Sequence, residues 1–229
     1  MHFLLPIGFA VIIGLVSYLF SVNKTKQALA LKSKPLKSLE LENKICALAM
    51  ALDLTHLNVN VYDIEPINGL AAPGGQIYIT QGFLSKFNKG EVTATEIASV
   101  IAHELGHVAL GHTRRRMIDF SGQNALRTAL SITLNRFIPV IGPWLANFAV
   151  TIIAARMSRK DEFEADSYAT ALMLKSGLGI QSQKTLLQKL DKLTGGTKSV
   201  PAWFMSHPKV GERLKAIELN EKKWTGTVS

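Results

Sequence analysis

Cysteine is nearly absent from this chain of 229 residues, in which Cys46 is the only one. A single thiol forms no disulfide within the chain, so a small disulfide-stapled scaffold is excluded. Charged residues are also scarce at 19%, below the usual fraction of about 25%. The hydrophobic fraction of 47% nevertheless excludes an intrinsically disordered chain. The length allows one domain of up to about 200 residues together with an appendage.

Acidic residues are missing from the first 39 positions, and this part of the chain begins with a long apolar segment. Phe3–Phe20 contains no formally charged residue over eighteen positions, which is just enough to cross a bilayer. No lysine or arginine precedes the segment, and it is longer than the apolar core of a usual signal peptide. We therefore expect residues 1–22 to form one retained transmembrane anchor and not a cleaved leader.

Five lysines follow the apolar segment before the first acid, and they are Lys24, Lys26, Lys32, Lys34 and Lys37. Because positive charge is retained on the cytoplasmic side of a membrane, residues 23–37 are expected to form a basic juxtamembrane linker to a cytoplasmic body. The lysines suit anionic lipid headgroups. Since no aromatic residues are interleaved with them, we expect membrane lipids and not nucleic acid as the partner.

Apolar periodicity over residues 38–229 predicts one domain of class α+β that is mainly α-helical. Residues 57–64 and 76–80 alternate between apolar and polar, as half-buried strands do, and a turn-rich stretch separates them. This arrangement predicts a small antiparallel sheet. Helical spacing predicts helices at about 38–54, 89–116, 159–175, 181–193 and 208–222.

One of these predicted helices carries His103-Glu104-Leu105-Gly106-His107, an HExxH motif. Histidines four positions apart share one helix face, so both imidazoles can bind one Zn²⁺. Glu104 lies one residue away and reaches a water on the metal without binding the metal itself. The alternative is a pair of solvated surface histidines. It is disfavoured because the neighbouring residues are apolar nearly all round the helix, and buried histidines need partners.

A catalytic zinc site needs a third protein ligand and leaves the fourth position open to water. The next helical turn does not supply this ligand in the metzincin pattern, since Leu110 and Thr113 stand where glycine and histidine are required. His112 comes five residues after His107. On helical geometry we expect it to face elsewhere and to be structural.

Carboxylates on a later predicted helix are candidates for the missing ligand. Glu162 and Asp166 are four residues apart and share a face, whereas Glu164 points away. Glu162 is placed to complete the zinc site, with Asp166 accepting a hydrogen bond from one ligand histidine and fixing its tautomer. Taken alone, the segment also suits a solvated acidic patch.

The stretch HELGHVALGHTRRRM, followed by SRKDEFEAD, resembles the membrane-bound gluzincin metallopeptidases of the HtpX and CAAX prenyl protease type. That family pairs HExxH with a later ExxxD whose glutamate is the third ligand. The resemblance therefore implies a zincin-like metalloprotease domain that binds one Zn²⁺ per chain through His103, His107 and Glu162. It also implies that Glu104 is the catalytic base.

Two further stretches carry the resemblance. NGLAAPGGQIYIT is similar to the edge strand that lines the cleft of the family and receives substrate by strand addition. The substrate-binding residues that this implies are Asn68, Gly69, Leu70, Ala71, Ala72, Pro73 and Gly74. His207-Pro208 with Arg213 resembles the HPxxxxR element of the family, which implies a cleft histidine and an arginine that supports the site. The pattern departs at Gly69, where alanine is usual.

A second apolar segment, Phe137–Ala155, lies between the candidate ligands. A single membrane crossing there would put His107 and Glu162 on opposite sides, so only zero or two crossings are compatible with one zinc site. Charges and amides in the preceding stretch are unsuited to lipid. Pro139, Gly142 and Pro143 are expected to break the helix. We expect a lid or a membrane-facing wall at the cleft. The alternative is an ordinary buried pair of core helices.

Together these features predict a single-pass, membrane-anchored zinc metalloendopeptidase that works without ATP, because no P-loop is present. Glu104 would take the proton of the attacking water and pass it to the leaving amine. His207 and Arg213 would stabilise the oxyanion. The resemblance implies protein or peptide substrates, and among them misfolded membrane proteins. The competing prediction is a non-catalytic, zinc-stabilised chaperone or adaptor at the membrane, which would not need Glu104.

Overall fold

The computed structural model describes the backbone of residues 4–72, 74–112, 115, 131, 138, 141–194 and 210–226. Within these ranges, the side chains of 4–15, 17, 142–146, 148–158 and 191–194 are outside the description. Helices dominate the described chain. They are α1 (Leu4–Leu31), α2 (Leu39–Ala51), α3 (Gln81–Asn88), α4 (Ala94–Ala109), α6 (Ile141–Lys175), α7 (Gln181–Thr194) and α9 (Val210–Thr225). The expected mainly helical α+β class is confirmed.

Four short strands form one sheet in the order β1-β2-β4-β3, and they are β1 (Ser33–Pro35), β2 (Val59–Tyr62), β3 (Gly69–Ala71) and β4 (Ile77–Thr80). β1 pairs with β2 and β3 pairs with β4 in antiparallel register, but β2 and β4 run parallel. The prediction of an antiparallel sheet is therefore wrong at its centre. β3 lies between β2 and β4 in the sequence and runs antiparallel to β4. The chain therefore reverses direction before β4 begins, so β2 and β4 run parallel and do not form a simple hairpin.

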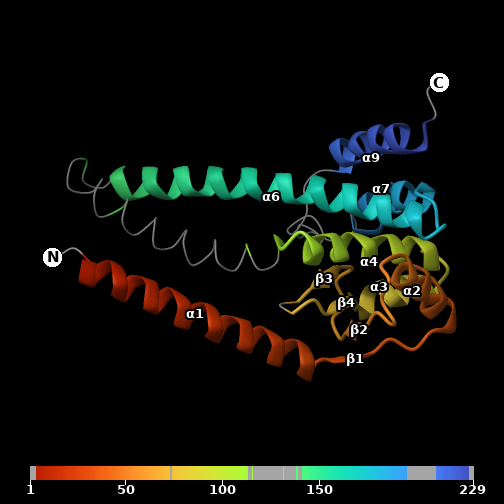
Figure 1. Cartoon of the computed structure of the whole chain (residues 1–229), viewed down its shortest axis with the longest axis horizontal. Coiled ribbons are helices and arrows are strands. Elements are labelled where there is room, and N and C mark those ends of the chain that lie inside the picture. Colours follow the sequence, from red (N-terminus) through yellow and green to blue (C-terminus); the bar gives the residue numbers. More distant parts are fainter. Residues whose placement is uncertain are drawn as a thin grey trace.

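Helix α4 lies at the centre of the body, between α6 on one side and the sheet with α2 on the other (Figure 1). Its residues from Ile97 to His107 are all buried, so it is covered on every side as its apolar sequence predicts. Thr93 caps its first turn. The Thr93 hydroxyl accepts a hydrogen bond from the Glu96 backbone N–H, and the Glu96 carboxylate accepts one from the Thr93 N–H. The Lys189 ammonium also contacts Glu96 and so ties α7 to this end of α4.

Helix α6 is continuous over 35 residues and joins the second apolar segment to the later carboxylates. The expected break at Gly142 and Pro143 is absent, because both residues lie in the first turn of the helix. Backbone N–H groups in the first turn of a helix have no acceptor within the helix, so a proline, which lacks this N–H, loses no hydrogen bond there. Pro139 lies outside the described residues. Helices α1 and α6 both begin at the end of the molecule away from the sheet (Figure 1).

Among the described residues, no helix is both long and apolar enough to cross a membrane. The expected anchor over Phe3–Phe20 falls largely on the part of α1 whose side chains are outside the description. The backbone of α1 continues as helix to Leu31, through Lys24 and Lys26. The stretch expected to be a basic linker, 23–37, therefore contains the end of α1 and the edge strand β1.

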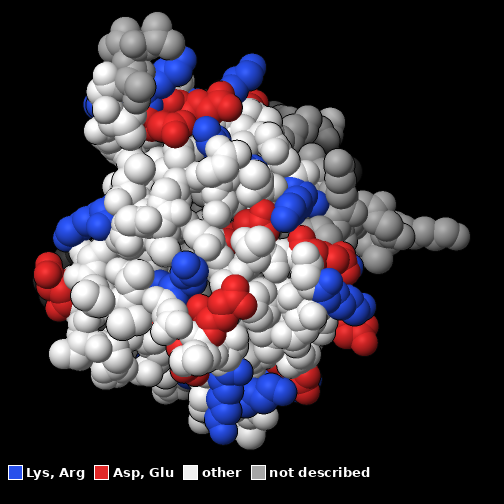
Figure 2. Space-filling model, turned by 90° about the vertical axis from the view of Figure 1, so that its right-hand side faces the viewer, with Lys and Arg blue, Asp and Glu red and all other residues white. Residues whose placement is uncertain are grey.

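Charged side chains of both signs are interspersed at the end of the body opposite to the start of α1. Figure 2 shows Lys and Arg alternating with Asp and Glu over this face, with uncharged surface between them. The net charge of +9 is therefore not gathered on this face as one basic patch.

Candidate metal centre

Helix α4 brings His103 and His107 side by side. The two rings are one helical turn apart, with centroids separated by 4.8 Å and planes at 86°. Their Nε2 atoms lie 3.2 Å apart, and each residue is only 3% exposed. Both imidazoles therefore present the same nitrogen to one point inside the protein.

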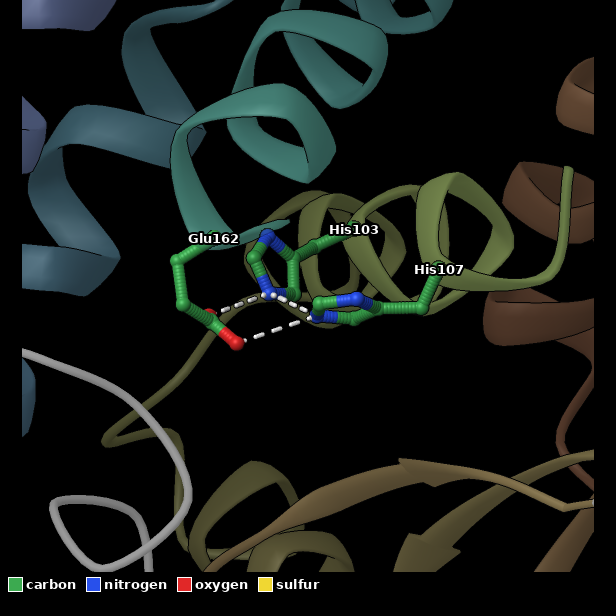
Figure 3. A group of neighbouring side chains, drawn as sticks. All are labelled: His103, His107 and Glu162. Carbon is green, nitrogen blue, oxygen red and sulfur yellow. Dashed lines mark hydrogen bonds and ion pairs between the residues drawn. The ribbon is translucent and has the colours of Figure 1, made fainter. Parts of the chain in front are cut away.

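Glu162 reaches this point from α6 and is fully buried (Figure 3). Its Oε2 lies 3.2 Å from His103 Nε2, and its Oε1 lies 3.3 Å from His107 Nε2. The three residues offer ligand atoms that all lie within 4.8 Å of one another. Two imidazole nitrogens and one carboxylate oxygen are a donor set that suits a catalytic Zn²⁺ with its fourth position open.

Asp166 lies one turn after Glu162 on α6 and holds the outer nitrogen of His103. Its Oδ1 accepts a hydrogen bond from His103 Nδ1 at 2.9 Å. Arg213 of α9 donates to both oxygens of this carboxylate, from Nε to Oδ2 and from Nη2 to Oδ1, each at 2.7 Å. Both residues are buried, at 1% and 2% exposure. This arrangement keeps a proton on His103 Nδ1, where it is donated to Asp166, and directs Nε2 toward Glu162, where a metal would replace its proton.

The pKa values of this group show a site built for positive charge. Burial alone lowers the pKa of His103, but hydrogen bonds with Asp166 and Glu162 outweigh burial and raise it from 6.5 to about 9. Burial raises the pKa of Asp166, yet the charge of Arg213 outweighs it and lowers this pKa from 3.8 to about 2. The carboxylates that attract a proton to His103 attract a divalent cation in its place.

Glu104 lies on α4, where its side chain approaches strand β3. It is 4% exposed. A Cβ built on Gly69 would lie 3.4 Å from Glu104 Cγ and 3.6 Å from its Oε1, and it would collide with the side chain of Val100. The absence of a side chain at Gly69 therefore lets β3 approach the helix that carries the motif. β3 is also the edge of the sheet in the described part of the chain.

The structure describes some of the remaining predicted site residues and not others. Asn68 precedes β3, and its backbone N–H donates to Thr80 Oγ1 at 3.0 Å. Leu70 and Ala71 belong to β3, and Ala72 and Gly74 follow it. His207 and Pro73 lie outside the described residues, so the structure does not place the expected cleft histidine.

His112 contradicts the expectation that it faces away from the site. It is fully buried, and His107 Nδ1 lies 3.0 Å from its Nδ1. Its Nε2 lies 3.1 Å from Glu164 Oε2, so Glu164, expected to point away from Glu162, contacts this histidine. The expectation fails because α4 ends at Ala109, and Gly111 adopts a φ of 70° that turns the chain. Gly111 is the one local signal in the sequence for this turn.

Comparisons with known proteins are consistent with this geometry. Residues 35–221, more than half of the chain, match Peptidase family M48. Metalloprotease LoiP of Escherichia coli (strain K12) is 31% identical over 161 residues, covering 70% of this chain and 61% of that protein. Metalloprotease YcaL of the same strain is 33% identical over 172 residues, covering 75% and 65%.

A human relative is more distant. Mitochondrial metalloendopeptidase OMA1 of Homo sapiens is 26% identical over 169 residues, covering 70% of this chain and 31% of that protein. The chain spans less than two thirds of the length of each of these three relatives.

Proposed function

This chain belongs to Peptidase family M48, and from that premise we propose that it is a zinc metalloendopeptidase that binds one Zn²⁺ per chain. The observation that carries the proposal is the convergence of His103, His107 and Glu162. Glu104 is buried on the helix that carries both histidines. The expected resemblance holds at the level of the family. The relatives named above are LoiP, YcaL and OMA1, so an HtpX or CAAX type remains a finer assignment that rests on the sequence motifs.

The proposed reaction is hydrolysis of a peptide bond. Bound zinc would polarise the scissile carbonyl and lower the pKa of a water at the open position. Glu104 takes a proton from the attacking water and passes it to the leaving amine, so the peptide bond breaks without another cofactor. A substrate strand adding to β3 would run past Glu104, because Gly69 lies directly against that side chain.

Arg213 and His207 are proposed to support the reaction from the end of the chain. Nε and Nη2 of Arg213 are both directed at Asp166, which favours a positioning role through His103. His207 is proposed as a cleft histidine that stabilises the oxyanion, on its resemblance to the HPxxxxR element. No P-loop is present in the sequence, so the reaction is proposed to proceed without ATP.

We further propose that the enzyme is held at a membrane by α1 and degrades misfolded membrane proteins from the cytoplasmic side. Val16, Leu19 and Phe20 are each more than half exposed on α1, and five lysines follow them. Ile141, at the start of α6, is 55% exposed, which favours a membrane-facing wall over a buried core. A reporter fused to the C-terminus should be active on the cytoplasmic side only. Activity on the opposite side would overturn this topology.

Glu104→Gln tests the enzyme against the alternative of a non-catalytic, zinc-stabilised chaperone or adaptor. The amide cannot accept the proton, so cleavage of casein by the full chain in detergent should fall at least about 100-fold, while one zinc per chain is retained. Glu91→Gln is the matched control, because Glu91 is an exposed carboxylate that pairs with Lys86 on the surface. Wild-type cleavage by Glu104→Gln, or chelator-insensitive cleavage, would refute the proposed mechanism.

A further inference from the structure

We propose that His112 is a positioning residue for the metal ligand His107, as Asp166 is for His103. The inference rests on the proposed zinc site and adds a residue that the HExxH and ExxxD motifs do not contain. His107 Nε2 faces Glu162 and the Nε2 of His103. Its Nδ1 therefore carries the proton when a metal is bound, and this N–H donates to His112 Nδ1 at 3.0 Å.

The protonation of His112 follows from this contact. Since His112 Nδ1 accepts a hydrogen bond, the proton of its neutral ring is on Nε2. This N–H donates to Glu164 Oε2 at 3.1 Å, with Asp161 Oδ1 at 3.7 Å as a second nearby carboxylate oxygen. Each contact thus allows only one tautomer of the next ring, and together they hold His107 with Nε2 toward the metal position.

The position of His112 is determined by the turn that follows α4 and not by helical periodicity. After α4 ends at Ala109, the positive φ of Gly111 turns the chain so that His112 comes back beside His107. The two rings lie with centroids 5.1 Å apart and planes at 66°. Because Asp161 and Glu164 belong to α6, His112 also connects the end of α4 to the helix that provides Glu162.

A second metal ion at His112, Asp161 and Glu164 is disfavoured, although their ligand atoms lie within 4.8 Å of one another. Arg115 Nη2 already lies 3.5 Å from Asp161 Oδ1, and Lys160 Nζ lies 3.4 Å from Glu164 Oε1. These two basic side chains already contact the carboxylates that a second metal ion would have to bind. The carboxylates are therefore assigned to His112 and to the two basic side chains.

The two ligand histidines are supported differently. Asp166 is an anion whose charge is balanced by Arg213, while His112 is a neutral ring. His103 is thus supported through an ion pair, and His107 is supported through an imidazole ring. Both partners hold the outer nitrogen of a ligand histidine and leave its Nε2 facing the metal position.

The test measures zinc affinity of the full-length protein in detergent by competition with a chromogenic chelator. His112→Phe keeps a buried ring but accepts no hydrogen bond, and it should weaken zinc binding about 10- to 100-fold. His112→Gln retains an oxygen acceptor for His107 Nδ1–H and amide donors for Glu164, so it should recover most of the affinity. His56→Phe is the matched control at an exposed histidine outside the site and should bind zinc as the wild type does.

A second variant covers the possibility that His112→Phe does not fold. Glu164→Ala removes the acceptor at a half-exposed position and should weaken zinc binding about 3- to 10-fold, a smaller loss because Asp161 remains nearby. Both variants should lower kcat at saturating zinc more than they raise KM, since the substrate strand lies elsewhere. Wild-type zinc affinity in a folded His112→Phe protein, or in Glu164→Ala if the former does not fold, would overturn the proposal.

Zinc stoichiometry separates this proposal from the function on which it rests. One zinc per wild-type chain is expected, and two would replace the positioning role with a second metal site. A wild-type protein that binds one zinc and cleaves casein, but is insensitive to His112→Phe, would refute only the role of His112. A wild-type protein that binds no zinc would refute the proposed enzyme as well.

Discussion

The buried pair of Asp166 and Arg213 allows the strongest quantitative prediction about this protein. Two hydrogen bonds of 2.7 Å join side chains that are 1% and 2% exposed. Asp166→Asn keeps the shape of the side chain but removes the nearest counter-charge of Arg213. Breaking one side of a buried ion pair costs about 3–5 kcal/mol. We expect that loss in the free energy of unfolding of the zinc-free protein, measured by urea denaturation.

The complementary change is Arg213→Met, which leaves the Asp166 carboxylate in the same buried place. It should also cost about 3–5 kcal/mol, because the carboxylate loses both hydrogen bonds from Arg213 and the charge that lowers its pKa. The double variant has no unpaired charge at this position, so its destabilisation should fall short of the summed single effects by about 3 kcal/mol. Additive single effects would refute the conclusion that these two groups stabilise each other directly.

A surface pair provides the matched control for this cycle. Lys184 and Glu221 are as close as 2.9 Å, but their side chains are 18% and 36% exposed. Solvent screens such a pair, so the corresponding cycle with Lys184→Met and Glu221→Gln should give a coupling of about 1 kcal/mol or less. A coupling as large as that of the buried pair would show that distance and not burial controls the effect.

Two other predictions concern pH and packing. The pKa of Asp166 is lowered from 3.8 to about 2, so its ionised form stabilises the fold above pH 4 and this contribution is lost as the pH falls toward 2. Relative to Asp166→Asn, the zinc-free wild type should lose about 2 kcal/mol between pH 5 and pH 2, and parallel pH profiles would contradict this. Gly69→Ala should cost about 1–3 kcal/mol through collision with Val100. Val100→Ala should relieve that cost in the double variant, and no relief would exclude the collision as its cause.

The metal ligands were predictable from the sequence because their relative positions depend on spacing within single helices. His103 and His107 are four residues apart inside α4, and Glu162 and Asp166 are four residues apart inside α6. Any continuous helix puts such pairs on one face. That α6 packs on α4 was not evident from periodicity, and the sequence indicated it only through the chemical need for a third ligand.

The predictions that failed depend on where elements begin and end. Helical periodicity does not extend to His112, because α4 stops at Ala109 and the φ of 70° at Gly111 turns the chain back toward His107. Pro143 was expected to break a helix, yet a proline in the first turn is compatible with one that starts at Ile141. The parallel pairing of β2 with β4 likewise depends on the short intervening strand β3.

These boundaries also determine how the site is supported. α4 supplies both histidines, but the partner of His107 comes from the turn that follows it, while the partner of His103 comes from α6. A longer α4 would carry residue 112 onward along the helix and separate it from His107 Nδ1. The contact between His112 and His107 therefore depends on α4 ending at Ala109, and the metal site needs this helix end as well as the residues that would bind the metal.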